Sequence, residues 1–435
     1  MSTFVILFVA AVISFAIRSR TALKFFALLM LFASGVAAVS GIPLGLESFT
    51  TTPAVILFEV VLLIVMAAVV LSEDENINIT QTLFLGTASV ALLESSSFLT
   101  FILSFEALSI ISFVLVSNIK DRDSAVGAVK MFVSGALATA MIVLGSAFYL
   151  FEGHELNAPL QEVGVYGTVG LWIMLMGLFY KLTIVPMHTW AADSYAQMRP
   201  SHAAILSGMV KSVAAVAVFM TFSPFLLQQS DLNTPILVTL ALVTMTLGNF
   251  MALFQKQVGK ILSYSSIAHA GYMLLAFVAV KSAYAPTAIF YVAIAYIFMQ
   301  TALFMLLDKV GEGSSKVTLE DLKGLGERDK SMALLFTVQL FSLAGIPLLA
   351  GFLSKAVLVY AVVDVGLPWV ALITLLNSAL SVAYYAWIIK HIYFDAPSHN
   401  TLGHLRVSSF VAQAILLSGT LYFGLFAATV FDLFV

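Results

Sequence analysis

Long apolar stretches recur from one end of this sequence to the other, and they constrain its fold more than any other feature. Of the 435 residues, 61% are hydrophobic and only 10% are charged, whereas a soluble domain carries about 25% charged residues. A helix that crosses a membrane needs about 20 mainly apolar residues. The pattern therefore predicts an all-α polytopic membrane protein, and excludes a soluble domain with a single anchor.

Fourteen stretches are candidate membrane spans. They cover residues 3–17, 22–42, 53–72, 78–95, 97–117, 124–150, 165–185, 200–226, 235–254, 258–280, 286–307, 332–361, 367–393 and 408–433. No basic segment precedes the first stretch, and no small-residue cleavage site with a polar mature domain follows it. We therefore expect a retained helix there rather than a signal peptide.

The basic residues between these spans give the orientation. If the N-terminus faces outside, one side of the membrane holds sixteen of them and the other side holds only Lys281. The sixteen are Arg18, Arg20, Lys24, Lys120, Arg122, Lys130, Arg199, Lys256, Lys260, Lys309, Lys316, Lys323, Arg328, Lys330, Lys390 and Arg406. Since basic loops stay in the cytoplasm, we expect both termini on the periplasmic side of a bacterial inner membrane.

Three lysines, Lys181, Lys211 and Lys355, lie inside the apolar spans, and Glu106 lies in the middle of another. A charge in the bilayer core costs about 2.5–3.5 kcal/mol on insertion scales, so it persists where it is paired, hydrated or functional. A static ion pair that holds helices together is one explanation for Glu106 and a single lysine. The charges of three lysines and one glutamate do not cancel. We therefore expect at least one lysine to be neutral part of the time, as a proton carrier is.

Two further titratable groups lie within spans. Glu59 either contacts a neighbouring subunit or assists a proton path. His269 is either a hydrogen-bonded packing residue or a proton relay, and the serines and tyrosines around it favour the relay, because histidine titrates near neutral pH.

Two spans contain helix-breaking residues close to a lysine. Pro186 follows Lys181, and Gly345, Pro347 and Gly351 precede Lys355. Proline removes a helical hydrogen bond, and irregular backbone is tolerated in a membrane only where protein or water covers it. Each break therefore predicts a cavity, unless these are two ordinary kinks.

Five spans separate the two breaks, which predicts two inverted five-helix repeats formed by spans 4–8 and 9–13. The expected units are a three-helix segment at residues 1–75, repeats at 76–226 and 233–393, and a C-terminal helix at 405–435.

Four motifs resemble the proton-pumping antiporter-like subunits of complex I and Mrp antiporters, over roughly residues 75–395. They are FEALS at 105–109, YKLTIVPMHTW at 180–190 with Asp193, KILSYSSIAHAGY at 260–272, and SLAGIPLLAGFLSK at 342–355. Within this family the third motif and Lys355 most resemble the N-type subunit. The M-type typically has glutamate at the position of Lys355, and we do not expect the long C-terminal lateral helix of the L-type.

The resemblance implies a role for each residue of a proton path. Glu106 would pair with Lys181, Lys211 would connect the two half-channels, His269 would lie on the axis between them, and Lys355 would be on the exit side. The family's small-residue, Pro-Thr-Pro-like approach to the eighth span is replaced here by MRPSH at 198–202, which adds Arg199 and His202 at a cytoplasmic entrance.

The resemblance also implies which components lie elsewhere. No residue of this chain is expected to be catalytic in the covalent sense or to bind a metal or cofactor, and the absence of cysteine excludes cysteine-ligated clusters. NADH, FMN, iron–sulfur clusters and quinone would belong to other subunits. The expected partners are an M-type subunit, small hydrophobic subunits and the lipid bilayer, without nucleic acid. The alternatives are an Mrp-type cation/proton antiporter subunit, a membrane-bound hydrogenase or ferredoxin-oxidoreductase subunit, and a structural scaffold with inert charges.

Overall fold

The computed structural model describes residues 2–40, 52–116, 122–397, 403 and 405–433. Helices make up nearly all of the regular structure in these ranges, and the one β-bridge joins Gln257 to Thr318. The helices are α1 (Ser2–Ser14), α2 (Arg20–Ser40), α3 (Pro53–Ser72), α4 (Asn76–Leu93), α5 (Phe98–Val116), α6 (Arg122–Phe151), α7 (Val165–Leu182), α8 (Ala191–Gln197), α9 (Pro200–Ala203), the π-helix η1 (Ala204–Val210), α10 (Lys211–Gln228), α11 (Ser230–Leu253), α12 (Val258–Val278), α13 (Ala285–Val310), α14 (Leu325–Arg328), α15 (Lys330–Ala344), α16 (Ala350–Asp364), α17 (Pro368–Phe394), α18 (Val407–Leu425) and α19 (Ala428–Phe431).

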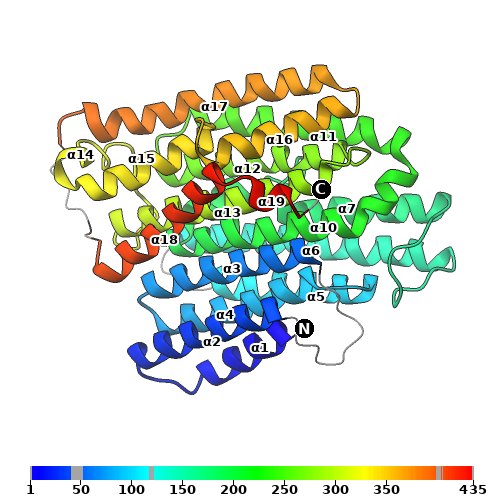
Figure 1. Cartoon of the computed structure of the whole chain (residues 1–435), viewed down its shortest axis with the longest axis horizontal. Coiled ribbons are helices and arrows are strands. Elements are labelled where there is room, and N and C mark those ends of the chain that lie inside the picture. The colour runs from blue at the N-terminus through cyan, green and yellow to red at the C-terminus, as the bar shows by residue number, and fades with distance from the viewer. Residues whose placement is uncertain (1, 41–51, 117–121, 398–402, 404, 434–435) are drawn as a thin grey trace.

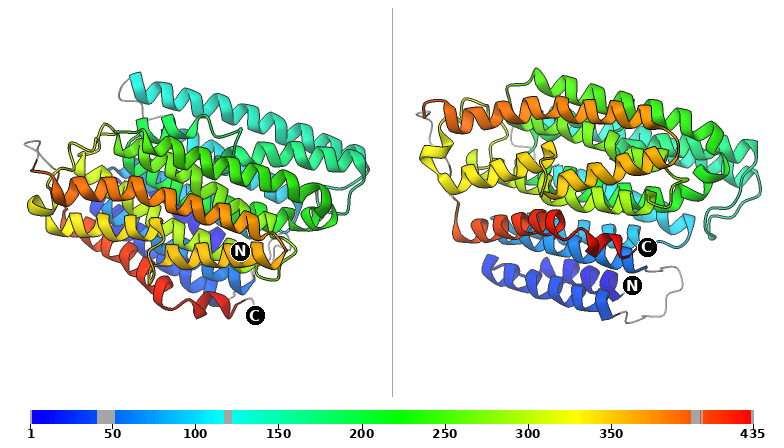
Figure 2. Two further views of the ribbon diagram at one scale, coloured as in Figure 1. Left: turned by 90° about the horizontal axis from the view of Figure 1, so that it is seen from above. Right: turned by 45° about the horizontal axis from the view of Figure 1, so that its top comes forward.

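The long helices run side by side and form one bundle (Figures 1 and 2). Helices α1, α2 and α4 lie on one side of it and α17 on the other, while α13 lies in the middle with its spanning segment buried throughout. The first and last helices, α1 and α19, lie near the same end of the bundle (Figure 1). The chain is therefore an all-helical, membrane-embedded protein, as its sequence predicts.

Each of the fourteen predicted spans coincides with helical structure in the described part of the chain. Eleven helical segments there are long and apolar enough to cross a membrane. The other three predicted spans correspond to the short helix α1, to α4, and to the pair α15 and α16. Helix α4 carries buried polar side chains, among them Asn78 and Thr82, which reduce its apolar character.

Both predicted breaks are present. Helix α7 ends at Thr183, whose φ of 60° is left-handed, and an irregular segment leads to the short helix α8. Helix α15 ends at Gly345 with a φ of +91°, and α16 begins only at Ala350. A left-handed residue at the end of a helix favours glycine, which explains Gly345 directly. A third irregularity, the π-helix η1, immediately precedes Lys211 and was not predicted.

Helices α11 and α12 approach each other closely at two glycines. A Cβ added to Gly248 would lie 2.5 Å from the backbone nitrogen of Ala268, and one added to Gly271 would lie 2.7 Å from that of Met245. Small residues permit such backbone contact between membrane helices. This contact holds α12, which carries His269, against its neighbour.

We expect Gly271→Ala to destabilise the fold by about 1–3 kcal/mol, because the added methyl group overpacks a backbone contact. The matched control is Gly259→Ala on the same helix, where a Cβ meets nothing closer than 3.6 Å. Thermal unfolding in detergent measures the effect. Equal unfolding temperatures for the two variants would show that α11 and α12 are not held together at Gly271.

Candidate functional site

Lys181 lies in the last turn of α7, directly before the break, and only 3% of it is exposed. Its ammonium group donates hydrogen bonds to the hydroxyl oxygens of Ser112 at 3.0 Å and Ser109 at 3.5 Å, both on α5. It also lies 5.9 Å from the centre of the Phe113 ring. Two hydroxyl groups and an aromatic ring of α5, all uncharged, therefore surround the Lys181 ammonium group.

Glu106 lies on α5, three residues before Ser109, but it does not pair directly with Lys181. One carboxyl oxygen accepts a hydrogen bond from Thr139 at 3.0 Å, and the other is buried without a partner. The structure thus shows no hydrogen bond or close ion pair between these two groups, and their predicted pairing stays a prediction. The two serine hydroxyls reach the ammonium group first, so acid and base interact through the intervening space along α5.

Lys211 connects the first broken helix to α12. It is fully buried at the start of α10. Its ammonium group donates to the Thr183 hydroxyl at 2.7 Å, and to the hydroxyl and carbonyl oxygens of Ser266 at 2.5 and 3.1 Å. Thr183 is the residue that ends α7, two positions after Lys181. The break therefore supplies a contact between the surroundings of the two lysines.

His269 lies on α12, one turn after Ser265. Its Nδ1 is 3.0 Å from the Ser265 carbonyl oxygen, so this nitrogen donates, and Nε2 is buried without a partner. The ring stacks on Tyr296 at 5.2 Å and contacts Tyr272 edge-on at 5.5 Å. An unpaired nitrogen among tyrosines can accept a proton or bind a water molecule.

Lys355 lies after the second break, on α16. Its ammonium group donates to the carbonyl oxygens of Leu343 at 2.9 Å and Ala344 at 3.1 Å, and to the Ser378 hydroxyl at 2.9 Å. The two carbonyls belong to the last turn of α15, where no helical N–H is available to them. The centre of the Tyr272 ring is 5.2 Å away, so His269 and Lys355 share this tyrosine.

The predicted proton-path residues therefore form a continuous file of neighbours. Glu106 lies on α5 together with the two serines that bind Lys181 of α7. Thr183 leads to Lys211, Ser266 leads along α12 to His269, and Tyr272 leads to Lys355. None of the three lysines forms an ion pair with any residue in the described part of the chain. The same part contains no group of three or more histidine or acidic residues that could hold a metal.

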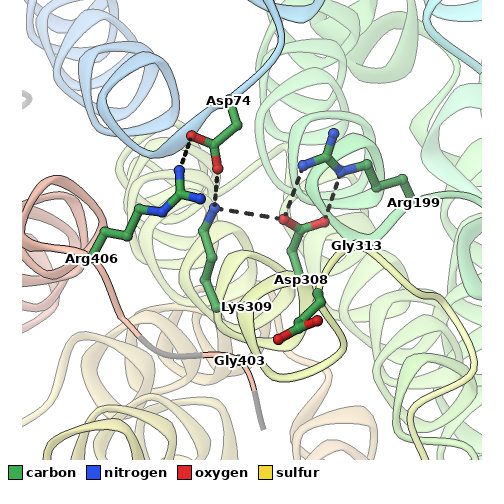
Figure 3. A pocket seen from close by; sticks show the side chains of 8 residues that line it. Asp74, Arg199, Asp308, Lys309, Gly313, Gly403 and Arg406 are labelled. Atoms are coloured by element: carbon green, nitrogen blue, oxygen red, sulfur yellow. Dashed lines mark hydrogen bonds and ion pairs between the residues drawn. The ribbon is translucent and has the colours of Figure 1, made fainter.

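A second group of charges lies at one end of the bundle, around Arg199 (Figure 3). Arg199 pairs with Asp308 at 3.0 Å, Glu75 at 2.9 Å and Glu73 at 3.5 Å. Asp74 pairs with Arg406 at 2.7 Å and with Lys309 at 3.7 Å. These pairs border a cavity of about 430 Å³. Arg199 of the MRPSH segment thus ties the α3–α4 connection to α13, and Asp74 ties the same connection to Arg406, the residue before α18.

The sequence of this chain matches the family model for the membrane part of NADH:quinone oxidoreductases and Mrp antiporters over residues 95–381. That segment includes the whole file from Glu106 to Lys355. The chain belongs to this family.

Curated members of the family resemble the chain over most of its length. NADH-quinone oxidoreductase subunit N of Trichlorobacter lovleyi is 31% identical over 92% of this chain and 87% of its own. F(420)H(2) dehydrogenase subunit N of Methanosarcina mazei is 30% identical over 82% of this chain and 77% of its own. A chain in respiratory complex I from Thermus thermophilus superimposes with a TM-score of 0.87 at 25% identity, over 99% of this chain and 98% of that one.

Sequence reasoning missed the neutral partners of these charges. Ser109 and Ser112 follow Glu106 at helical spacing, which could have identified them, but Thr183, Ser266 and Ser378 come from other helices and carry no local signal. The sequence allows two explanations for Glu59, a contact with a neighbouring subunit or assistance to a proton path. None of the residue is exposed in this chain.

Glu73 gives the Arg199 cluster a testable pH dependence. Burial works to raise the pKa of Glu73, but the Arg199 guanidinium and the Asp74 backbone N–H outweigh it and hold that pKa below its usual value. A lowered pKa stabilises the folded state fully above the unfolded-state pKa of about 4.3, and this stabilisation is lost as the pH falls through the lower folded-state value.

We expect Glu73→Gln to destabilise the protein by about 1–3 kcal/mol at neutral pH, because a charged hydrogen-bond acceptor is lost. The difference in unfolding temperature from the unmodified chain should narrow below about pH 4. The control is Glu320→Gln, which removes an exposed pair with Lys323 and should cost little. A difference that is constant with pH would contradict the charge-based explanation.

Proposed function

We propose that this chain is the N-type, proton-translocating antiporter-like subunit of a complex I-type quinone oxidoreductase. The single observation that carries the proposal is the continuous file of Glu106, Lys181, Lys211, His269 and Lys355 through the centre of the bundle. The similarity to proteins named subunit N supports the subunit type. Relatives of similar identity are named for NADH-quinone oxidoreductase and for F(420)H(2) dehydrogenase, so the proposal concerns proton transfer and not the electron donor.

Proton transfer along this file would be driven by electrostatics. A change of charge in a neighbouring subunit alters the field at Glu106 and Lys181, which have no direct contact to hold them together. Lys181 then passes its proton to Lys211 by way of the hydroxyl groups and water around Thr183. His269 relays it along α12, and Lys355 releases it on the far side. Coupling of this kind works through shifts in proton affinity and needs no covalent step.

The membrane topology that we propose has fourteen spans with both termini on the outer side of the inner membrane. Residues 76–226 and 233–393 form two inverted five-helix repeats, flanked by a three-helix segment at 1–75 and a helix at 405–435. The two broken helices, with a lysine beside each break, support this division. The distribution of basic residues supports the orientation, although Lys120, one of the sixteen, lies outside the described residues.

The chain would work as one part of a larger translocase. We propose that an M-type subunit and small hydrophobic subunits are its neighbours in the bilayer. NADH, FMN, iron–sulfur clusters and quinone would bind to other subunits, and this chain would contribute the proton path alone.

Proton pumping by inverted membrane vesicles that carry Lys181→Ala tests the proposal. We expect pumping and coupled electron transfer to fall together while the complex still assembles, because the lysine that receives the proton is lost. The control is Lys256→Ala, which removes an exposed loop lysine and should leave both activities unchanged. Normal pumping by the Lys181 variant would mean that the buried lysine is structural.

A further inference from the structure

Glu59 is a buried acid that the proposed proton path does not use. It lies on α3, it is completely inaccessible to solvent, and neither of its carboxyl oxygens has a hydrogen-bond partner. No basic residue in the described part of the chain forms an ion pair with it. An ionised carboxylate without donors or cations is costly to bury, so such a group either carries a proton or exchanges one.

Glu94 is the acidic neighbour of Glu59. It ends α4, only 1% of it is exposed, and its carboxyl group lies beside that of Glu59. Two carboxylates that share a site repel each other, and the usual outcome is that the pair holds one proton between them. The two residues come from adjacent helices, so the arrangement is a pair built by the fold and not a local cluster in the sequence.

The three serines that follow Glu94 lie at a cavity whose other lining residues are mostly apolar. Ser95, Ser96 and Ser97 line a cavity of about 340 Å³ between the end of α4 and the second half of α10. At about 30 Å³ for each water molecule, it has room for several. This cavity is at the opposite end of α4 from the Arg199 cluster, which contacts the residues just before that helix. Glu94 is itself buried, but it directly precedes in sequence the serines that line this cavity.

We propose that Glu59 and Glu94 form a proton-binding pair that exchanges its proton with water in the Ser95–Ser97 cavity. Beyond the one proton that the two carboxyl groups share, water in the cavity delivers a second proton through Glu94, which makes the pair neutral. The return of this second proton to water leaves one negative charge on the pair. The pair lies outside the file from Glu106 to Lys355. The binding of a proton by this pair does not rest on the proposed function.

Infrared spectroscopy of the intact purified complex tests this proposal, because a protonated carboxyl group has its own C=O band. We expect Glu59→Gln and Glu94→Gln each to remove the same band from the spectrum of the unmodified complex. That band should shift on transfer to D₂O, since the cavity gives water access to the pair. Glu59→Asp retains a carboxyl group and should retain a protonated band, and it serves where a glutamine variant fails to assemble.

Two controls separate this proposal from the proposed function. Glu155→Gln removes an exposed carboxylate and should leave the band intact. Lys181→Ala should also leave it intact even if pumping is lost, so the two ideas can fail independently. Spectra without a protonated band that depends on Glu59 and Glu94 would overturn the proposal, as would a band that never exchanges in D₂O.

Discussion

The structure depends on how three lysine ammonium groups are stabilised inside the membrane without a carboxylate in contact with any of them. Hydroxyl and carbonyl oxygens bind all three, and the two broken helices supply part of these acceptors. Lys355 takes the carbonyls that α15 leaves free where it ends at Gly345. Lys211 takes the hydroxyl of Thr183, the residue that ends α7. Neutral acceptors stabilise an ammonium group less firmly than an ion pair does, which suits the release of protons that we propose for these lysines.

The ion pairs in the described part of the molecule do not involve the three buried lysines, and one group of them surrounds Arg199. At one end of the bundle, Arg199 pairs with Asp308 of α13, and Asp74 of the α3–α4 connection pairs with Arg406 at the start of α18 (Figure 3). Because Arg199 makes three ion pairs at once, the N-terminal helices are fastened to the core on that side. The ion pairs that fasten helices together and the lysines of the proposed proton path are thus separate uses of charge.

The helices, the breaks and the buried lysines could be predicted from the sequence, because each has a local signal. These signals are an apolar run, a glycine or proline, and a charged residue within an apolar run. The hydrogen-bond partners of the buried charges could not be predicted from the sequence. Ser266 reaches Lys211, and Glu94 reaches Glu59, only after helices distant in the chain have packed. Charge complementarity suggests that Glu106 and Lys181 pair, but it does not reveal that Ser109 and Ser112 lie nearer to the ammonium group.

The most direct test of the central claim is proton pumping by a complex that carries Lys211→Arg. Arginine keeps the positive charge at this position but does not release its proton in proteins. If the buried lysines carry protons, pumping by this variant stops although the charge is preserved and the complex assembles. If the lysines serve only to balance charge and hold helices together, Lys211→Arg pumps as the unmodified complex does, and proton transfer through the buried lysines is contradicted.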